Sequence, residues 1–328
     1  MLLSITINNN VIAQLDKWAF FNTSNSKLPS NSIHVVKFDS SGGKWIGTRD
    51  AGLVYYNKDK WEIYNTDNSS LPHNRVFKIA IDSEDNKWIG TFGGGIAKIG
   101  KEEWTVYNSE NSGLSDNTIY AIAFDKNNAK WFGTAGGGIS IFDDQHWITY
   151  SPKNSILPNQ KITSILIDGD IKWIGTADQL VRIKDEDWKL GSELNFDPPP
   201  YAVYSITKDK TNRIIFGLKM SGVAIFNGKE YFHYNTKNSV LPGLRAYSVA
   251  VDSNNNVLIG IFGAGLIKYN ELGEWVVFNK DNSLLPDDFI TWVEVDKKNN
   301  IWIGTYRAGV VVFNENGLPL DMFENKKK

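Results

Sequence analysis

The chain has 328 residues, no cysteine and nearly balanced charge, with 35 basic against 37 acidic residues. The lack of cysteine excludes disulfides, thiolate metal sites and cysteine nucleophiles. A net charge of −2 leaves no basic footprint for phosphate binding, so no nucleic-acid partner is predicted. No apolar run approaches the roughly 20 residues that cross a bilayer, so no membrane insertion is predicted.

The first 17 residues form an N-terminal extension in this interpretation. The sequence Val-Ile-Ala-Gln at 11–14 is similar to the end of a secretory leader. The stretch has no basic start, however, and three asparagines at 8–10 interrupt its apolar part. A remnant leader and a plain extension therefore both stay open.

A repeat begins after this extension and continues almost to the C-terminus. The sequence Lys-Trp-Ile-Gly-Thr at 44–48 returns in related form six more times. Its glycines are 43, 43, 42, 42, 43 and 44 residues apart, at Gly47, Gly90, Gly133, Gly175, Gly217, Gly260 and Gly304. A second marker, an aromatic residue that opens a short apolar segment, starts at Trp18, Trp61, Trp104, Trp147, Trp188, Tyr231 and Trp275. A fixed period of about 43 residues is typical of propeller blades.

Each repeat predicts four strands joined by turns. The second repeat predicts strands at Val76–Ile81, Lys87–Thr91, Ile96–Ile99 and Trp104–Tyr107. The strands alternate with polar or glycine-rich turns, as in an antiparallel meander. One such sheet cannot bury both its faces, so the units must pack around a common axis. The sequence thus predicts an all-β fold, a single seven-bladed β-propeller with four antiparallel strands per blade.

The two ends of the repeat region predict how the ring closes. Trp18–Phe21 is a fourth strand without three strands before it, and residues 290–313 supply three strands without a fourth. The N-terminal strand is therefore expected to complete the last blade. The predicted propeller spans 18–314, and 315–328 is a C-terminal tail. Leu320–Phe323 is a weaker candidate for the same position, since it lacks the tryptophan.

An aspartate follows the first strand of every repeat, at Asp39, Asp82, Asp125, Asp168, Asp209, Asp252 and Asp296. A function is rarely needed seven times over. We expect turn formers whose carboxylates accept hydrogen bonds from nearby backbone N–H groups. No metal site and no cofactor is predicted.

At these residues the chain resembles the two-component regulator propeller family. The shared features are the Trp-Ile-Gly-Thr strand, a glycine-rich turn and a Leu-Pro crossover, which stands here at 28–29, 71–72, 157–158, 241–242 and 285–286. The resemblance implies the propeller fold. In the family's best-known setting such propellers are periplasmic sensors linked to carbohydrate fragments. The resemblance therefore also implies, as a hypothesis, that this chain is a periplasmic or secreted sensory module.

A ligand is expected where the crossover loops and the second-to-third strand turns converge, at the mouth of the central channel. Residues that break the repeat there combine cations with aromatic rings. Aromatic faces stack on sugar rings, and arginine pairs with carboxylates or sulfates. An ordinary polar rim is the alternative interpretation. The predicted mouth residues are Arg49, Arg75, Phe92, Lys161, Tyr201, Lys219, Arg245, Phe262, Tyr306 and Arg307.

In blades one, two and seven, the side chains expected at the channel wall differ from those at equivalent positions of the other blades. Lys78 and Trp292 occupy a column of mostly small residues, so both should protrude into the channel. Two positions later, Lys37 and Glu294 are the charged members of a column of Ala, Leu and Thr. Their blades become neighbours only if the ring closes, so we expect an ion pair between them.

No catalytic constellation is predicted. The four histidines lie at different points of the repeat, and the glycine clusters lie at hairpin turns rather than before helices. The leading hypothesis is a non-catalytic ligand-binding or sensory module for acidic or sulfated glycan fragments. A protein-interaction scaffold is the first alternative. A polysaccharide lyase or hydrolase is the second, because a lyase that uses tyrosine with arginine or lysine leaves no spacing signature.

Overall fold

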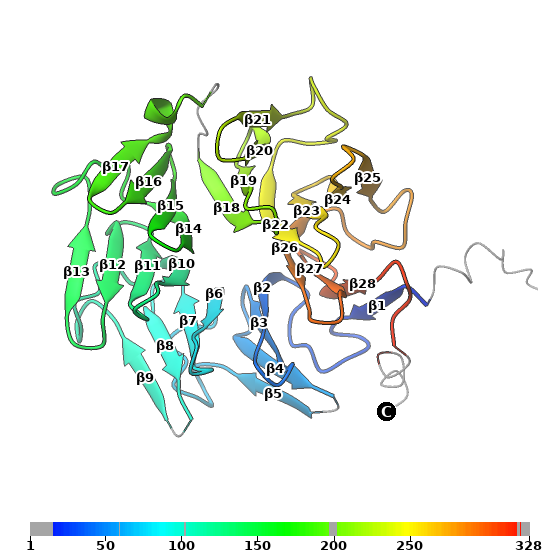
Figure 1. Ribbon diagram of the computed structural model, residues 1–328. Coiled ribbons are helices and arrows are strands. Elements are labelled where there is room, and N and C mark those ends of the chain that lie inside the picture. Colours follow the sequence, from blue (N-terminus) through cyan, green and yellow to red (C-terminus); the bar gives the residue numbers. More distant parts are fainter. Residues whose placement is uncertain (1–15, 59, 102, 197–201, 320–321, 323–328) are drawn as a thin grey trace, which may run out of the picture.

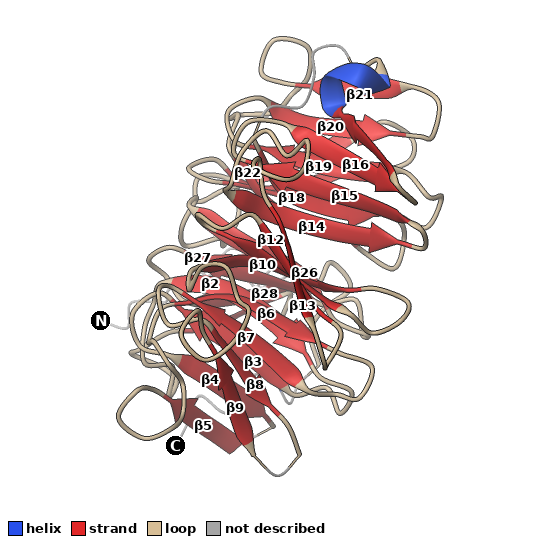
Figure 2. Cartoon of the chain, turned by 90° about the vertical axis from the view of Figure 1, so that its left-hand side faces the viewer, coloured by secondary structure: helices blue, strands red, loops and turns tan. Residues whose placement is uncertain are grey.

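The computed structural model describes residues 16–58, 60–101, 103–196, 202–319 and 322. They form seven antiparallel sheets of four strands each, arranged around a central axis (Figure 1). Seen from the side, the strands run between two faces covered by loops (Figure 2). The predicted all-β propeller is confirmed.

The blades are numbered in chain order, and their strands run from the axis outward. Blades one to three are β2–β5 (Ile33–Phe38, Lys44–Thr48, Leu53–Asn57, Lys60–Tyr64), β6–β9 (Val76–Ile81, Lys87–Thr91, Ile96–Ile99, Trp104–Tyr107) and β10–β13 (Ile119–Phe124, Lys130–Thr134, Ile139–Phe142, Trp147–Tyr150). Blades four to six are β14–β17 (Ile162–Asp168, Ile171–Thr176, Leu180–Lys184, Asp187–Leu190), β18–β21 (Val203–Lys208, Ile214–Leu218, Gly222–Phe226, Tyr231–Tyr234) and β22–β25 (Ala246–Val251, Val257–Ile261, Gly265–Tyr269, Trp275–Phe278). Blade seven joins β26 (Ile290–Val295), β27 (Ile301–Thr305) and β28 (Val310–Phe313) to β1 (Trp18–Phe21), and a 3-10 turn, η1 (Gly191–Leu194), follows β17.

The N-terminal strand closes the ring as predicted. β1 pairs antiparallel with β28, with Trp18 opposite Phe313 and Phe21 opposite Val310. The rings of Trp18 and Phe313 stack with centroids 4.2 Å apart. β28 is thereby paired on both of its edges, with β27 and with β1, so its outer edge is not left unpaired at the seam. Residues 320, 321 and 323 of the alternative strand lie outside the described residues.

The tryptophans of the Trp-Ile-Gly-Thr strands pack between neighbouring blades. Trp88 is fully buried, and its ring lies 5.8 Å from that of Phe132 in the next blade. The glycine two residues later makes this close packing possible. A Cβ at Gly90 would lie 2.8 Å from the Ile119 side chain of the next blade. The marker sequence is thus explained by contact between blades.

The repeated aspartates form turns in six of the seven blades. Asp82 accepts hydrogen bonds from the backbone N–H groups of Glu84 and Asn86, and from the indole of Trp88. Equivalent backbone bonds form at Asp39, Asp125, Asp209, Asp252 and Asp296. Asp168 differs from the prediction: it is the last residue of β14 and forms an ion pair with Lys208 of the next blade. The turn after it is shorter, because β15 starts at Ile171.

Candidate functional site at the channel mouth

In every blade the structure joins the turn after the second strand to the loop that enters the inner strand, and these two segments carry the described mouth residues. The residue after the last position of each marker strand, which is threonine in five blades, Leu218 in blade five and Ile261 in blade six, donates its backbone N–H to the carbonyl of the residue just before the inner strand. The bonds are 2.9–3.0 Å long and link Arg49 to Ser32, Phe92 to Arg75, Ala135 to Thr118, Ala177 to Lys161, Lys219 to Ala202, Phe262 to Arg245 and Tyr306 to Phe289. The loops that carry the predicted cations and rings therefore lie side by side at one face.

Every inner strand also carries a β-bulge at this face. In blade one, Ile33 lies opposite Thr48 and Val35 opposite Gly47, so His34 has no partner of its own. Such an extra residue re-aims a side chain, which is why bulges are common beside binding sites. The bulge residues of blades one to seven are His34, Phe77, Tyr120, Thr163, Tyr204, Tyr247 and Thr291.

Five of the seven bulge residues carry aromatic rings, and these rings pack from blade to blade. The Phe77 ring centroid lies 4.9 Å from that of His34 and 4.9 Å from that of Tyr120. On the other side, the centroid of Tyr247 lies 5.0 Å from that of Tyr204. The two bulge threonines instead donate their hydroxyls to carbonyls of the next blade, Val203 and Ile33.

The predicted mouth rings extend these contacts. The Phe262 ring stacks on Tyr247 at 4.7 Å, and its edge contacts Tyr306 at 5.8 Å. Phe92 contacts Phe77 at 5.8 Å. We call this group of rings the aromatic collar; it comprises His34, Phe77, Phe92, Tyr120, Tyr204, Tyr247, Phe262, Phe289 and Tyr306.

Cations lie over several rings of the collar. The Arg75 guanidinium lies 4.8 Å from the Phe92 centroid, and Arg49 lies 4.9 Å from that of Tyr306. Lys161 approaches the Tyr120 centroid at 4.8 Å. Such contacts orient a cation without neutralising it. We call the six predicted cations the rim cations; they are Arg49, Arg75, Lys161, Lys219, Arg245 and Arg307.

Most rim cations have no anionic partner in the part of the chain that the structure describes. Arg307 is the exception, because it pairs with Asp287 at 3.2 Å. For the other five, no carboxylate lies within ion-pair distance among residues 16–319 that are described. The mouth therefore presents cations outside ion pairs beside aromatic surface, together with carboxylates such as Asp50 and Asp116, whose charges act on His34 and Tyr120 of the collar.

Ionisable groups of the collar are held neutral at ordinary pH. The pKa of His34 is lowered to about 4, chiefly by burial and also by the charges of Arg49 and Arg75, while the carbonyl of Val76 and the charge of Asp50 oppose them. Burial also raises the pKa of Tyr204 and of Tyr247. The collar thus offers uncharged rings, and its charge comes from the rim cations.

Sequence reasoning located most of the mouth but missed part of the collar. Tyr201 lies outside the described residues, and Lys219 and Arg245 are exposed. The collar members missed were the five bulge rings and Phe289. A signal was available, since the residue five positions before each turn aspartate is aromatic or histidine in five of the seven repeats.

Below the collar, the channel holds a cavity of about 550 Å³, which we call the inner cavity. The four predicted wall residues line it, and Lys37 forms the predicted ion pair with Glu294 at 2.9 Å. The Lys78 ammonium lies 4.2 Å from the Trp292 ring centroid. None of the described mouth residues lines this cavity. The channel therefore has two chemically different zones.

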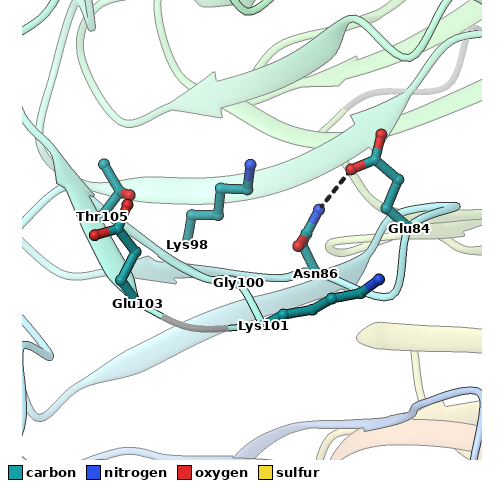
Figure 3. Close-up of a pocket in the computed structure, with 7 residues that line it drawn as sticks. All are labelled: Glu84, Asn86, Lys98, Gly100, Lys101, Glu103 and Thr105. Carbon is teal, nitrogen blue, oxygen red and sulfur yellow. Dashed lines mark hydrogen bonds between the residues drawn. The ribbon is translucent and has the colours of Figure 1, made fainter.

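A second cavity, of about 540 Å³, lies on blade two (Figure 3). Its charged lining is mixed, with Lys98 and Lys101 against Glu84 and Glu103. Lys98 belongs to β8, and the other three lie in turns at the end of the blade opposite the mouth, where Asn86 donates to Glu84 at 3.4 Å. Among the described residues, no group of three or more His, Cys, Asp or Glu side chains gathers as metal ligands would.

Comparison with known proteins agrees with this architecture. Residues 284–307 match the family model of the two-component regulator propeller, so the chain carries a repeat of this family. The extracellular domain of the hybrid two-component system BT3049 from B. thetaiotaomicron superposes with a TM-score of 0.78 at 20% identity, over 92% of this chain and 42% of that one. The predicted resemblance is confirmed.

Other propellers superpose as well. A surface component of the type-IX secretion system of Porphyromonas gingivalis, PorZ, has a TM-score of 0.69 at 17% identity, over 87% of this chain and 46% of that one. A streptogramin B lyase has a TM-score of 0.73 at 16% identity, over 90% of this chain and 97% of that one. Identities this low establish the fold alone. Among curated proteins, none matches the sequence.

The chain spans about two fifths of the length of the extracellular-domain structure that it matches. No helix among the described residues has both the length and the apolarity to cross a bilayer.

Proposed function

We propose that this propeller is a non-catalytic sensory domain that works outside the cytoplasm and binds acidic or sulfated glycan fragments at the channel mouth. The observation that carries the proposal is the pairing of aromatic faces with cations that lack carboxylate partners in the described residues. Rings supply stacking surface for sugars, and the cations supply charge-assisted hydrogen bonds to carboxylate or sulfate groups.

The cation–ring contacts support an anionic ligand rather than a neutral one. The Arg75 guanidinium is fixed over Phe92, and its Nε donates to the carbonyl of Arg49 at 3.2 Å. A guanidinium held in place before the ligand arrives loses less conformational entropy on binding. Phe92 remains 41% exposed, which leaves ring surface for a sugar.

The setting outside the cytoplasm is supported by the structures that superpose. Two of them are extracellular domains of signalling systems from B. thetaiotaomicron. The sensory role rests on the same likeness together with the matched repeat.

Calorimetric titration with a chondroitin sulfate tetrasaccharide tests the proposal, with its desulfated form and cellotetraose as comparison ligands. We expect binding of the sulfated form, weaker binding of the desulfated form and none of cellotetraose. Arg75→Met should weaken binding about tenfold or more, because it removes charge-assisted hydrogen bonds while keeping most of the side-chain volume.

Lys98→Met is the matched control, because Lys98 also lies over an aromatic ring, that of Trp88, but at the opposite end of blade two. It should leave the affinity unchanged. Equal loss in both variants, or equal binding of cellotetraose, would contradict a glycan site at the mouth. Release of unsaturated products from acidic polysaccharides would instead support the lyase alternative.

An acidic protein partner is the second candidate. It is favoured by one observation, that the described mouth residues line neither of the two cavities. Small ligands usually occupy concave sites, whereas protein partners bind flatter surfaces of about 800 Å² on each side. Failure of every oligosaccharide, together with retention of a secreted protein by the wild type but not by Arg75→Met, would favour this candidate.

A further inference from the structure

We propose that the inner cavity is a second binding site, which takes a small organic monoanion, a carboxylate with an apolar body, through the ammonium group of Lys78. The site differs from the channel mouth in position and in ligand. No described rim cation or collar ring lines the inner cavity. This proposal can therefore be tested independently of the glycan proposal.

The charges that line the inner cavity do not balance. Three lysines line it, and two of them have carboxylate partners: Lys37 pairs with Glu294 at 2.9 Å, and Lys208 pairs with Asp168 at 2.5 Å. Lys78 has no carboxylate within ion-pair distance among the described residues. One positive charge thus remains without a carboxylate partner among the described residues of this lining.

Trp292 holds the Lys78 side chain inside the channel. The ammonium lies 4.2 Å from the ring centroid, and the indole N–H donates to Glu294 at 3.2 Å. The ring is therefore fixed, and it attracts the ammonium through its π face without cancelling the charge. A lysine at a protein surface normally extends its ammonium into bulk water, and Lys78 does not.

The position of Lys78 in the channel also changes the pKa of its ammonium group. Its pKa is lowered to about 7, chiefly by burial and also by the nearby charge of Lys37, while Glu294 opposes both. The groups that face Lys78 are thus Lys37 from β2 and Trp292 and Glu294 from β26. An anion bound beside the ammonium would restore the charged form, so binding and protonation favour each other.

The opposite wall supplies a hydroxyl that can help to bind an anion. Ser205 accepts the backbone N–H of Val249 at 3.1 Å, and no hydrogen bond among the described residues uses its own proton. Ser164, in contrast, donates to the carbonyl of Val203 at 3.0 Å. An anion on Lys78 that extends across the channel would meet the free donor of Ser205.

Apolar side chains form part of the rest of the lining, beside the polar groups that account for most of its exposed surface. Ile79, Ile122 and Ile165 contribute to it, and the cavity volume of about 550 Å³ lies in the range of small-molecule sites. A carboxylate with an apolar body satisfies both parts of this lining. A polyanion does not, since one unpaired cation faces the cavity.

Benzoate is the probe for this site, and benzamide is its neutral isostere. Calorimetric or ligand-detected NMR titration at about pH 6.5 should show that benzoate binds and that benzamide binds at least about tenfold more weakly. Lys78→Met should lower the benzoate affinity to that of benzamide. The control Lys98→Met removes the same charge outside the channel and should change nothing.

The pH dependence of the benzoate affinity is a second measurement that tests the proposal. The benzoate affinity of the wild type should fall as the pH rises above about 7, because Lys78 then loses its proton. The Lys78→Met variant should show no such fall, and near-ultraviolet circular dichroism should show that it keeps the native fold. Three outcomes would overturn the proposal: no benzoate binding, equal binding of benzamide, or an unchanged affinity in Lys78→Met.

Discussion

The two ends of the propeller follow opposite rules. At one end, six turn aspartates repeat the same backbone hydrogen bonds, and four of them also accept a tryptophan indole. At the other end, the bulge position changes from blade to blade among histidine, phenylalanine, tyrosine and threonine. The positions that repeat thus stabilise the turns and the packing between blades. The positions that vary place different side chains around the axis, as a single asymmetric site requires.

The largest effect is expected where the repeated contacts are buried. Trp302→Ala removes a fully buried ring that stacks on Phe21 and donates to Asp296. We expect a loss of about 3–5 kcal/mol in the free energy of unfolding, measured by urea denaturation. Phe92→Ala at the mouth is the control and should cost less than about 1 kcal/mol. Similar losses in both variants would remove the distinction between the two ends.

A smaller effect is expected at the turn aspartates, and it depends on pH. Burial alone would raise the pKa of Asp82, but hydrogen bonds from Trp88 and Asn86 lower it overall. The folded state therefore favours the carboxylate, and this stabilisation is present above the unfolded value of about 3.9 and lost as the pH falls through the folded value.

Asp82→Ala should cost about 1–3 kcal/mol at neutral pH, because buried donors lose their acceptor. Asp82→Asn keeps an acceptor oxygen and should lose part of the acid sensitivity below about pH 4. Urea denaturation at several pH values measures both. An Asp82→Asn variant with the acid sensitivity of the wild type would show that Asp82 carries none of it.

The smallest effect is expected at the ion pair between blades one and seven. The side chains of Lys37 and Glu294 are 31% and 23% exposed, so water screens their attraction. A double-mutant cycle with Lys37→Met and Glu294→Gln should give a coupling energy of about 0.5–1 kcal/mol that falls with added salt. No measurable coupling at low salt would mean that the pair does not contribute to closure.

The sequence contained enough information for the blades and their closure. The four strands predicted for blade two and the strand Trp18–Phe21 match the observed bounds. They could be predicted because glycine, asparagine and aspartate end each strand, and because apolar residues fill the faces between blades. The Lys37–Glu294 pair was predictable because closure alone makes their blades neighbours.

The collar was harder to predict because it depends on an irregularity of register. A bulge adds one residue to one strand of a pair, and a single sequence does not show which partner that residue lacks. His34, for example, looks like a member of an ordinary strand until Ile33 and Val35 are paired. Blade four shows the same limit, since its short turn moves Asp168 into the strand.

The seam also determines when the fold can be completed. Trp18 pairs with Phe313 across almost the whole described chain. Blades one to six can form from residues close in sequence, but the last sheet must wait until both distant segments exist. During synthesis, β1 therefore stays without its partner until nearly all of the other strands have been made. The mouth acquires its full ring of neighbours at the same moment, because its loops come from all seven blades.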